Sequence, residues 1–472
     1  MLLQLDQDYL AQIKKYSDDL EKRYSNILAT DAFLTRQLVS FQANKQEPIY
    51  RWYKYKEAFS AKLVSYLLDR YGLSAGKILD PFAGAGTAIF SASEWGMDSI
   101  GIELLPIGQE IIQTRKCIEN SDNKNIVRKL KKIRDEIPWT NAKGERGFNV
   151  LRITKGAYSG ETESQIKKFL WFIDKLEDKT IRQILFFSLL CIIESVSFTR
   201  KDGQYLRWDY RSGRTCGKEG FDKGHIYDFT GALTGKIDEI IRDLTDTGRQ
   251  MELIFSHKNT KPDRGEVSLL NGSCLLELPK MRDDYFSGVI TSPPYCNRYD
   301  YTRTYALELA LLGVDEERLR TLRQTMLSCT VENKEKDLID LNPQWRKAVE
   351  IAENHNLLQS ILAYLDDLRS KDELNNDGIF RMVKSYFYEM ACVIYECHRV
   401  LRKNGFMMMV NDNVKYAGVG IPVDLILSSI AEEIGFRVKD ILVLPQGKGN
   451  SSQQMGVHGR EVLRKCIYIW EK

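Results

Sequence analysis

The residues that first suggest chemistry are Ser292, Pro293, Pro294 and Tyr295, which directly follow a short apolar stretch at 288–290. Two consecutive prolines remove two backbone donors and fix φ, so a sheet strand must end there. The loop that remains is rigid, and open α/β sheets place their ligand sites at the carboxyl ends of strands. It presents a hydroxyl, free carbonyls and an aromatic ring, a set that suits holding a planar amine by its N–H groups. An ordinary rigid loop that caps a strand is the plainer alternative.

A turn rich in small residues, Asp-Pro-Phe-Ala-Gly-Ala-Gly-Thr at 80–87, is the second candidate site. Gly84 and Gly86 lack Cβ atoms, so the backbone can turn tightly and let a ligand approach the N-terminus of the following helix. Glu103 stands 23 residues after Asp80, the distance at which an acidic residue of a Rossmann-like unit meets ribose hydroxyls. Position 89 is Ile, so the third glycine of a dinucleotide fingerprint is missing. We therefore expect a ligand that lacks a pyrophosphate rather than NAD; a turn without a ligand is the alternative.

These residues need strands and helices to position them. Residues 77–80 and 99–103 predict two strands around a helix, a unit typical of a parallel sheet with crossover helices. Further elements are expected as strands at 267–270, 287–291, 406–410, 437–444 and 462–470 and as helices at 379–401 and 423–434. The first seventy residues and the charged stretches between the strands show helical spacing.

We therefore predict an α/β sheet domain that is discontinuous in the sequence. A helical N-terminal region covers 1–75. The sheet domain comprises 76–105, 262–312 and 376–472, and two helical insertions at 106–261 and 313–375 interrupt it.

The motifs D-P-F-A-G-A-G-T and T-S-P-P-Y together resemble those of the S-adenosylmethionine-dependent DNA amino-methyltransferases, which modify cytosine N4 or adenine N6. The Ser-Pro-Pro-Tyr version is similar to the cytosine-N4 branch, whereas adenine enzymes more often carry Asp or Asn at the position of Ser292. The resemblance implies a Rossmann-like class I methyltransferase sheet and S-adenosylmethionine as the cofactor. It covers both motifs and the α/β segments around them, and it says little about the insertions.

Carried over residue by residue, the resemblance implies a cofactor site beside a site for a flipped base. Glu103 would hold the ribose, and residues 51–60 would pack beside the methionine end of the cofactor; a surface aromatic helix start is the alternative for that segment. Ser273 stands where the family usually has an Asp that touches the adenine. The implied cofactor-binding residues are Trp52, Asp80, Pro81, Phe82, Ala83, Gly84, Gly86, Thr87, Glu103, Ser273 and Ser292. The implied catalytic residues are Ser292, Pro293, Pro294 and Tyr295.

A basic and aromatic strip lies inside the first insertion, which is our candidate DNA-recognition region. Basic groups pair with phosphates, and Arg forks or aromatic rings can read or stack on bases. The alternative is a solvated basic loop, or Arg side chains that bridge the insertion to the core. The predicted DNA-binding residues are Arg200, Lys201, Tyr205, Arg207, Trp208, Arg211 and Arg214.

Composition limits the classes of protein that fit. The 472 residues are 43% hydrophobic and 28% charged, which supports a sizeable core, and the net charge of +3 means that any nucleic-acid surface must be local. Nine cysteines without a C-x-x-C pair favour a reducing compartment over a disulfide framework or a structural zinc site. The start lacks a basic and apolar leader, and the apolar run at 184–193 is too short to span a bilayer. We expect a cytoplasmic protein without a metal.

The sequence thus predicts a DNA cytosine-N4 methyltransferase that acts on double-stranded DNA by base flipping, in a restriction-modification or host-defence system. Any cleavage would belong to a separate restriction endonuclease. Adenine-N6 methylation, an RNA base methyltransferase and a catalytically silent DNA-binding subunit are the alternatives. Cys296 follows Tyr295 and invites the cytosine-C5 mechanism with a covalent thiolate, but that chemistry is expected to follow a Pro-Cys arrangement.

Overall fold

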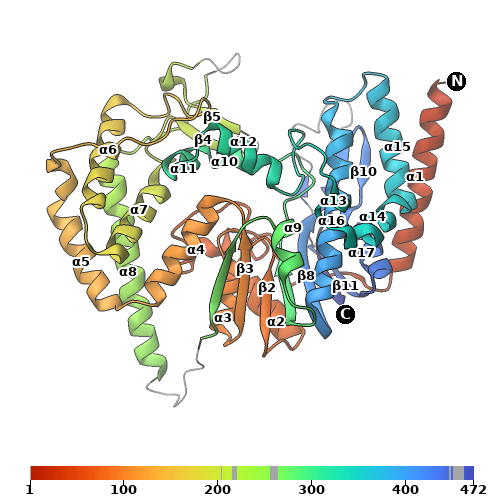
Figure 1. Ribbon diagram of the computed structural model, residues 1–472, viewed down its shortest axis with the longest axis horizontal. Coiled ribbons are helices and arrows are strands. Elements are labelled where there is room, and N and C mark those ends of the chain that lie inside the picture. The colour runs from red at the N-terminus through yellow and green to blue at the C-terminus, as the bar shows by residue number, and fades with distance from the viewer. Residues whose placement is uncertain (1, 203–204, 215–219, 256–263, 446–447, 450–461) are drawn as a thin grey trace.

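The computed structural model describes residues 2–202, 205–214, 220–255, 264–445, 448–449 and 462–472. An eight-stranded sheet in the order β1-β11-β14-β8-β7-β2-β3-β6 runs through the middle of the molecule (Figure 1). Its strands are β1 (Leu28–Thr30), β2 (Lys77–Asp80), β3 (Asp98–Glu103), β6 (Val267–Asn271), β7 (Phe286–Thr291), β8 (Leu401–Asp412), β11 (Arg437–Val443) and β14 (Lys465–Glu471). β14 is antiparallel to β11 and β8, and the other neighbouring strands are parallel. This is the Rossmann-like class I methyltransferase arrangement, so the predicted fold class is confirmed.

The middle strands are apolar on both sides because helices cover both faces of the sheet. All six residues of β7 are buried. In β8, Met408 belongs to an apolar cluster with α2 (Ala61–Arg70) and α3 (Thr87–Glu94). Met407 and Met409 point the other way and belong to a cluster with α16 (Gly378–Val400) and α17 (Val423–Ile434). The alternation of successive side chains along a strand therefore divides the core into two layers.

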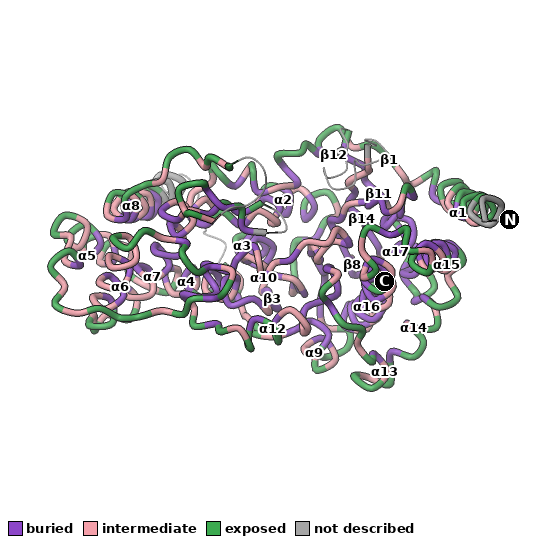
Figure 2. Tube along the Cα trace, turned by 90° about the horizontal axis from the view of Figure 1, so that it is seen from above, coloured by how far each residue is buried: buried purple, intermediate pink, exposed green. Residues whose placement is uncertain are grey.

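Helices also gather at the two ends of the sheet (Figures 1 and 2). One group is formed by α5 (Asn123–Glu136), α6 (Gly160–Asp174), α7 (Lys179–Ile192) and α8 (Phe229–Phe255). The opposite group is formed by α1 (Leu2–Tyr24), α13 (Leu338–Leu341), α14 (Arg346–Glu353) and α15 (Asn356–Ser370), beside α16 and α17. The helices near the sheet and its loops are α4 (Pro106–Glu119), α9 (Cys274–Glu277), α10 (Tyr301–Thr304), α11 (Ala306–Leu311) and α12 (Glu316–Thr325). Within the described residues, no helix is both long and apolar enough to cross a membrane.

Short hairpins complete the fold, and three segments differ from the sequence prediction. The hairpin strands are β4 (Thr199–Asp202), β5 (Tyr205–Trp208), β9 (Val414–Tyr416), β10 (Val419–Ile421), β12 (Lys448–Gly449) and β13 (Val462–Leu463). Residues 28–60 contain no α-helix: β1 joins the sheet beside β11, and turns and the short 3-10 helix Ala43–Gln46 follow it. β4 and β5 lie in a stretch expected to be helical, and β8 begins five residues before the predicted strand. Strands of three or four residues are too short to show the period-two pattern that identifies them.

Candidate active site

The glycine turn and the Ser-Pro-Pro-Tyr turn lie side by side because they follow neighbouring parallel strands, β2 and β7. The hydroxyl of Thr291, at the end of β7, donates a hydrogen bond of 2.6 Å to the Asp80 carboxylate at the end of β2. The Phe82 N–H donates to the same carboxylate oxygen at 3.0 Å. Burial raises the pKa of Asp80 to about 7, and these two hydrogen bonds oppose the rise. Asp80 therefore links the two turns from inside the protein.

A cavity of about 770 Å³ opens at this edge of the sheet, lined by residues of both turns. Of the predicted cofactor and catalytic residues, the cavity is lined by Asp80, Pro81, Phe82, Ala83, Gly84, Thr87, Glu103, Ser273, Ser292 and Pro294. Further residues from other elements complete it, among them Tyr55, Glu57, Leu105, Tyr301 and Leu327. One carboxyl group at each of two strand ends, together with a largely apolar wall, suits a ligand that has both sugar hydroxyls and a flat ring.

The glycine turn has the backbone that the sequence requires. Gly84 and Gly86 have φ of 52° and 80°, the left-handed region that L side chains rarely adopt. A Cβ at Gly86 would lie 2.8 Å from the Ile112 side chain, so a side chain at this position would clash with α4. Glu103 accepts hydrogen bonds of 2.6 Å from the N–H groups of Gly84 and Leu105. Burial raises the pKa of Glu103 to about 8, against the effect of those N–H donors.

A second cavity, of about 1440 Å³, adjoins the first. Its lining includes Pro293 and Tyr295, and it shares Ser292, Glu57 and Tyr301 with the first cavity. The Ser292 hydroxyl lies 3.2 Å from the Val410 carbonyl oxygen and 3.1 Å from the Tyr295 hydroxyl. Burial raises the pKa of Tyr295, so its phenol stays protonated at neutral pH. Ser292 thus stands at the junction between the two cavities.

Trp52 lies outside the first cavity, so the structure does not bring it together with the other predicted cofactor residues. Its indole N–H donates to the Asp243 carboxylate at 2.8 Å, and its ring packs near Phe187, so the side chain joins the N-terminal segment to the first insertion. Tyr55 lines the cavity instead, with its ring 3.3 Å from where a Cβ of Gly84 would be. Sequence inspection found the correct segment and could not tell which of its aromatic side chains faces inwards.

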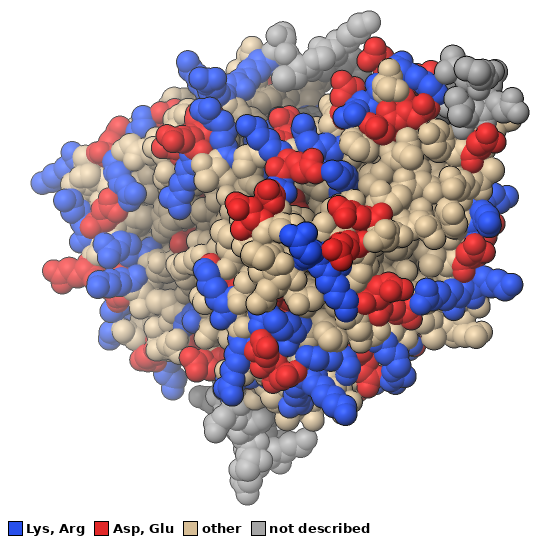
Figure 3. Space-filling view, turned by 45° about the vertical axis from the view of Figure 1, so that its right-hand side comes forward, with Lys and Arg blue, Asp and Glu red and all other residues tan. Residues whose placement is uncertain are grey.

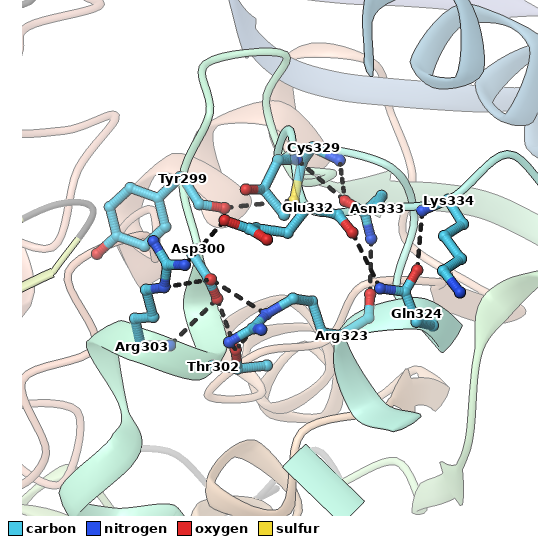
Figure 4. A network of polar contacts seen from close by, with 11 residues as sticks. Tyr299, Asp300, Thr302, Arg303, Arg323, Gln324, Cys329, Glu332, Asn333 and Lys334 are labelled. Atoms are coloured by element: carbon cyan, nitrogen blue, oxygen red, sulfur yellow. Dashed lines mark hydrogen bonds and ion pairs between the residues drawn. The ribbon is translucent and has the colours of Figure 1, made fainter. Parts of the chain in front are cut away.

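A buried polar network fixes the loop that carries Tyr299 and Tyr301 (Figure 4). Asp300, only 2% exposed, accepts hydrogen bonds from the Thr302 hydroxyl at 2.6 Å and from the Arg303 N–H at 3.1 Å. The guanidinium groups of Arg303 and Arg323 pair with the same carboxylate at 3.2 and 3.1 Å. Because this acid begins α10, the network holds both flanking tyrosines in the walls of the cavities. No local pattern in the sequence points to this network, because Arg323 comes from a separate helix, α12.

Several known proteins are similar to this chain along nearly its whole length. Type II methyltransferase M.AvaI of Nostoc sp. and of Anabaena variabilis is 52% identical over 472 residues, which cover 99% of this chain and 96% of each relative. Type II methyltransferase M.BsoBI of Geobacillus stearothermophilus is 41% identical over 476 residues, covering 96% of this chain and 91% of the relative. The chain belongs to the type II methyltransferase family. No family model and no solved structure matches it.

In this type II methyltransferase the basic strip divides into buried and exposed residues. Lys201 is 4% exposed, and its ammonium donates to the Glu308 carboxylate and, at 3.2 Å, to the Tyr53 hydroxyl. Trp208 is 6% exposed, and the Arg214 guanidinium covers its ring at 3.9 Å. Lys201 and Trp208 are therefore buried rather than exposed to a DNA backbone, and Lys201 joins the insertion to α11 and to the N-terminal segment.

Arg200 and Arg207 are exposed cations of the strip, as is Arg211. Arg200 and Arg207 face each other across the β4–β5 pair, so their side chains lie on the same side of the hairpin. Arg211 forms an ion pair of 2.6 Å with Asp209, and the side chain of Tyr205 lies outside the described part of the chain. On the face seen in Figure 3, basic side chains are interspersed with acidic ones, as the net charge of +3 implies.

Cys296 and the potential metal ligands concern two other kinds of chemistry, a thiolate nucleophile and a metal centre. Cys296 is fully buried, and burial raises the pKa of its thiol well above the usual range, which disfavours a thiolate nucleophile. Among the described residues, no group of three or more His, Cys, Asp or Glu side chains is arranged to hold a metal ion.

Proposed function

We propose that this methyltransferase transfers a methyl group from S-adenosylmethionine to the exocyclic N4 amine of cytosine in double-stranded DNA, at specific sites and by flipping the target base. The observation that carries the proposal is the pair of adjoining cavities with Ser292 at their junction. We place the reaction in a restriction-modification or host-defence system, because the relatives are type II methyltransferases, and leave cleavage to a separate restriction endonuclease.

The residues of the first cavity fit S-adenosylmethionine. Glu103 ends β3 with a buried carboxylate that can accept hydrogen bonds from two ribose hydroxyls. Because Gly84 has no Cβ, its backbone leaves space for a ligand between the turn and the Tyr55 ring. Ser273 lies in the lining, but its hydroxyl donates to the Thr325 carbonyl at 3.2 Å, so a contact with the adenine remains a prediction. When bound, the cofactor supplies an electrophilic methyl group.

The residues of the second cavity suit a flipped cytosine. The Tyr295 ring offers a face on which the base can stack, and the Ser292 hydroxyl and Pro293 carbonyl oxygens can accept the two N–H groups of the amine. These hydrogen bonds hold the nitrogen lone pair towards the junction of the cavities. There the new N–C bond forms as the S–C bond breaks, and one amine proton passes to solvent.

The identity of the methylated base tests the proposal. The protein is incubated with plasmid DNA and isotope-labelled S-adenosylmethionine, and the digested nucleosides are identified by mass spectrometry. We expect N4-methylcytosine, with Ser292→Ala reduced by at least about tenfold. Ser360→Ala is the matched control, because Ser360 donates to a backbone carbonyl on α15. N6-methyladenine as the sole product would refute the cytosine assignment and favour the adenine alternative.

Cofactor binding separates an enzyme from a catalytically silent DNA-binding subunit. Calorimetry should show that the protein binds S-adenosylmethionine and that Gly84→Asp abolishes binding, because the new side chain would meet the Tyr55 ring in a strained backbone conformation. A wild-type protein that binds neither the cofactor nor its demethylated product would support the silent subunit.

A further inference from the structure

An ion pair between Lys465 and Asp412 lines the second cavity. Lys465 begins β14 and stands directly opposite Asp412, the last residue of β8. The Lys465 ammonium is 3.2 Å from the Asp412 carboxylate and 3.4 Å from the Tyr295 hydroxyl. Both residues of the pair line the cavity together with Ser292 and Pro293. Three separate elements therefore bring a cation beside the residues proposed to hold the base.

The surroundings keep this cation charged. The side chains of Lys465 and Asp412 are only 18% and 20% exposed. Burial by itself would lower the pKa of Lys465, but the Asp412 carboxylate and the Tyr295 hydroxyl outweigh it and raise the pKa. The ammonium has three N–H donors; one is directed to the Tyr295 hydroxyl, and Asp412 is held as an ion pair. Among the described residues no other side chain accepts a hydrogen bond from this ammonium, so it has a donor for a ligand in the cavity.

The other cations of this lining are placed differently. The Lys56 ammonium donates to the Lys201 backbone carbonyl, and burial lowers its pKa. Arg36 has an exposed side chain in the turn after β1. Of the described cations that line the cavity, Lys465 is the one that contacts Tyr295, and the Tyr295 hydroxyl is in turn 3.1 Å from Ser292.

We propose that Lys465 binds the target base directly, by donating a hydrogen bond to the ring acceptors of the flipped cytosine while Asp412 holds the ammonium in place. This inference rests on the proposed function. Cytosine presents an amine and then two acceptors, N3 and O2, along one edge. Adenine presents an amine, one acceptor and a C–H group. A cation beside the groups that hold the amine therefore favours cytosine, and it gives the cavity a means of choosing its base beyond Ser292.

The test compares the kinetics of four variants with those of the wild type. Lys465→Met should lower kcat/KM for DNA by about 10- to 100-fold, the loss expected for one hydrogen bond from a charged donor. Lys465→Arg should retain most of the activity. The double variant Lys465→Met/Asp412→Asn removes the unpaired carboxylate that could impair folding, and it should show the same loss. The matched control is Lys439→Met, from an exposed lysine on β11. Cofactor affinity by calorimetry should be unchanged in all four.

A double-mutant cycle distinguishes base binding from mere orientation of Tyr295. If Lys465 acted only through the Tyr295 hydroxyl, Lys465→Met would cause no further loss in a Tyr295→Phe background. Direct binding predicts a further loss of at least about tenfold in that background.

The outcomes separate this inference from the proposed function. Wild-type N4-methylcytosine with an unaffected Lys465→Met overturns the inference alone. N6-methyladenine as the sole wild-type product overturns both. If the folded Lys465→Met/Asp412→Asn variant no longer binds the cofactor, the role of Lys465 in the base cavity is overturned. The loss of activity would then come from the cofactor cavity.

Discussion

The hydrogen bond between Thr291 and Asp80 should decide how firmly the two turns are coupled. Thr291→Val keeps the shape of a fully buried side chain and removes the donor that lies 2.6 Å from a buried carboxylate. A hydrogen bond to a charged group contributes about 1.5–3 kcal/mol, and the Phe82 N–H alone then opposes burial. The pKa of Asp80 should therefore rise further above about 7.

The loss of stability in Thr291→Val should depend on pH. At pH 8 the folded variant must either bury a poorly solvated carboxylate or take up a proton, whereas at pH 6 the carboxyl group is already protonated in both proteins. Thermal unfolding of a chain of 472 residues should show a drop in Tm of about 1 °C for each kcal/mol lost, larger at pH 8 than at pH 6. S-adenosylmethionine affinity should also fall at pH 8, by about tenfold, because Asp80 lines its cavity.

Two comparisons make the test selective. Thr291→Ser keeps the donor and should retain affinity. Thr114→Val removes a buried hydroxyl that accepts a hydrogen bond from neutral Gln183 on α7, and it should leave cofactor affinity unchanged. A Thr291→Val protein with wild-type Tm and affinity at pH 8 would refute the view that Asp80 is held by Thr291.

Three further changes test other parts of the structure. Gly86→Ala should destabilise the protein by more than the ~1–2 kcal/mol of a left-handed residue, because its Cβ would lie 2.8 Å from a neighbouring side chain; Gly156→Ala has a similar φ in open space and measures the backbone cost alone. Arg207→Ala should lower the dependence of DNA affinity on salt concentration by about 1 in the log–log slope and leave Tm unchanged. Lys201→Met should instead lower Tm, because it leaves the buried Glu308 carboxylate without its cation. The opposite pattern would reverse the two assignments. Burial holds the pKa of Glu103 at about 8, so the folded state binds this proton more tightly than the unfolded chain does, and Tm of the cofactor-free protein should fall as pH rises from about 5 to 8. Glu103→Gln should flatten that part of the pH profile, and an unchanged profile would contradict the assignment.

What could be predicted from the sequence was local. The strand that ends at Asp80, its glycine turn and Glu103 lie within 27 residues, so propensity and spacing identify them together. Ser292 was found in the same way, from two prolines after a strand. What could not be predicted depends on contacts between distant segments. Lys201 looked like a DNA contact because its partner Glu308 lies more than 100 residues away, and Lys465 was missed because only strand pairing brings it to Tyr295.

The position of β14 has a consequence for how the protein is made. This strand lies between β11 and β8 in the sheet, yet it follows both of them in the sequence. Segments leave the ribosome in chain order, so β11 and β8 emerge without the strand that joins them. The sheet can close only after residues 465–471 have been synthesised, and Lys465 arrives with them. A chain whose translation stops before residue 465 would carry both sequence motifs intact and still lack the strand that joins β11 to β8.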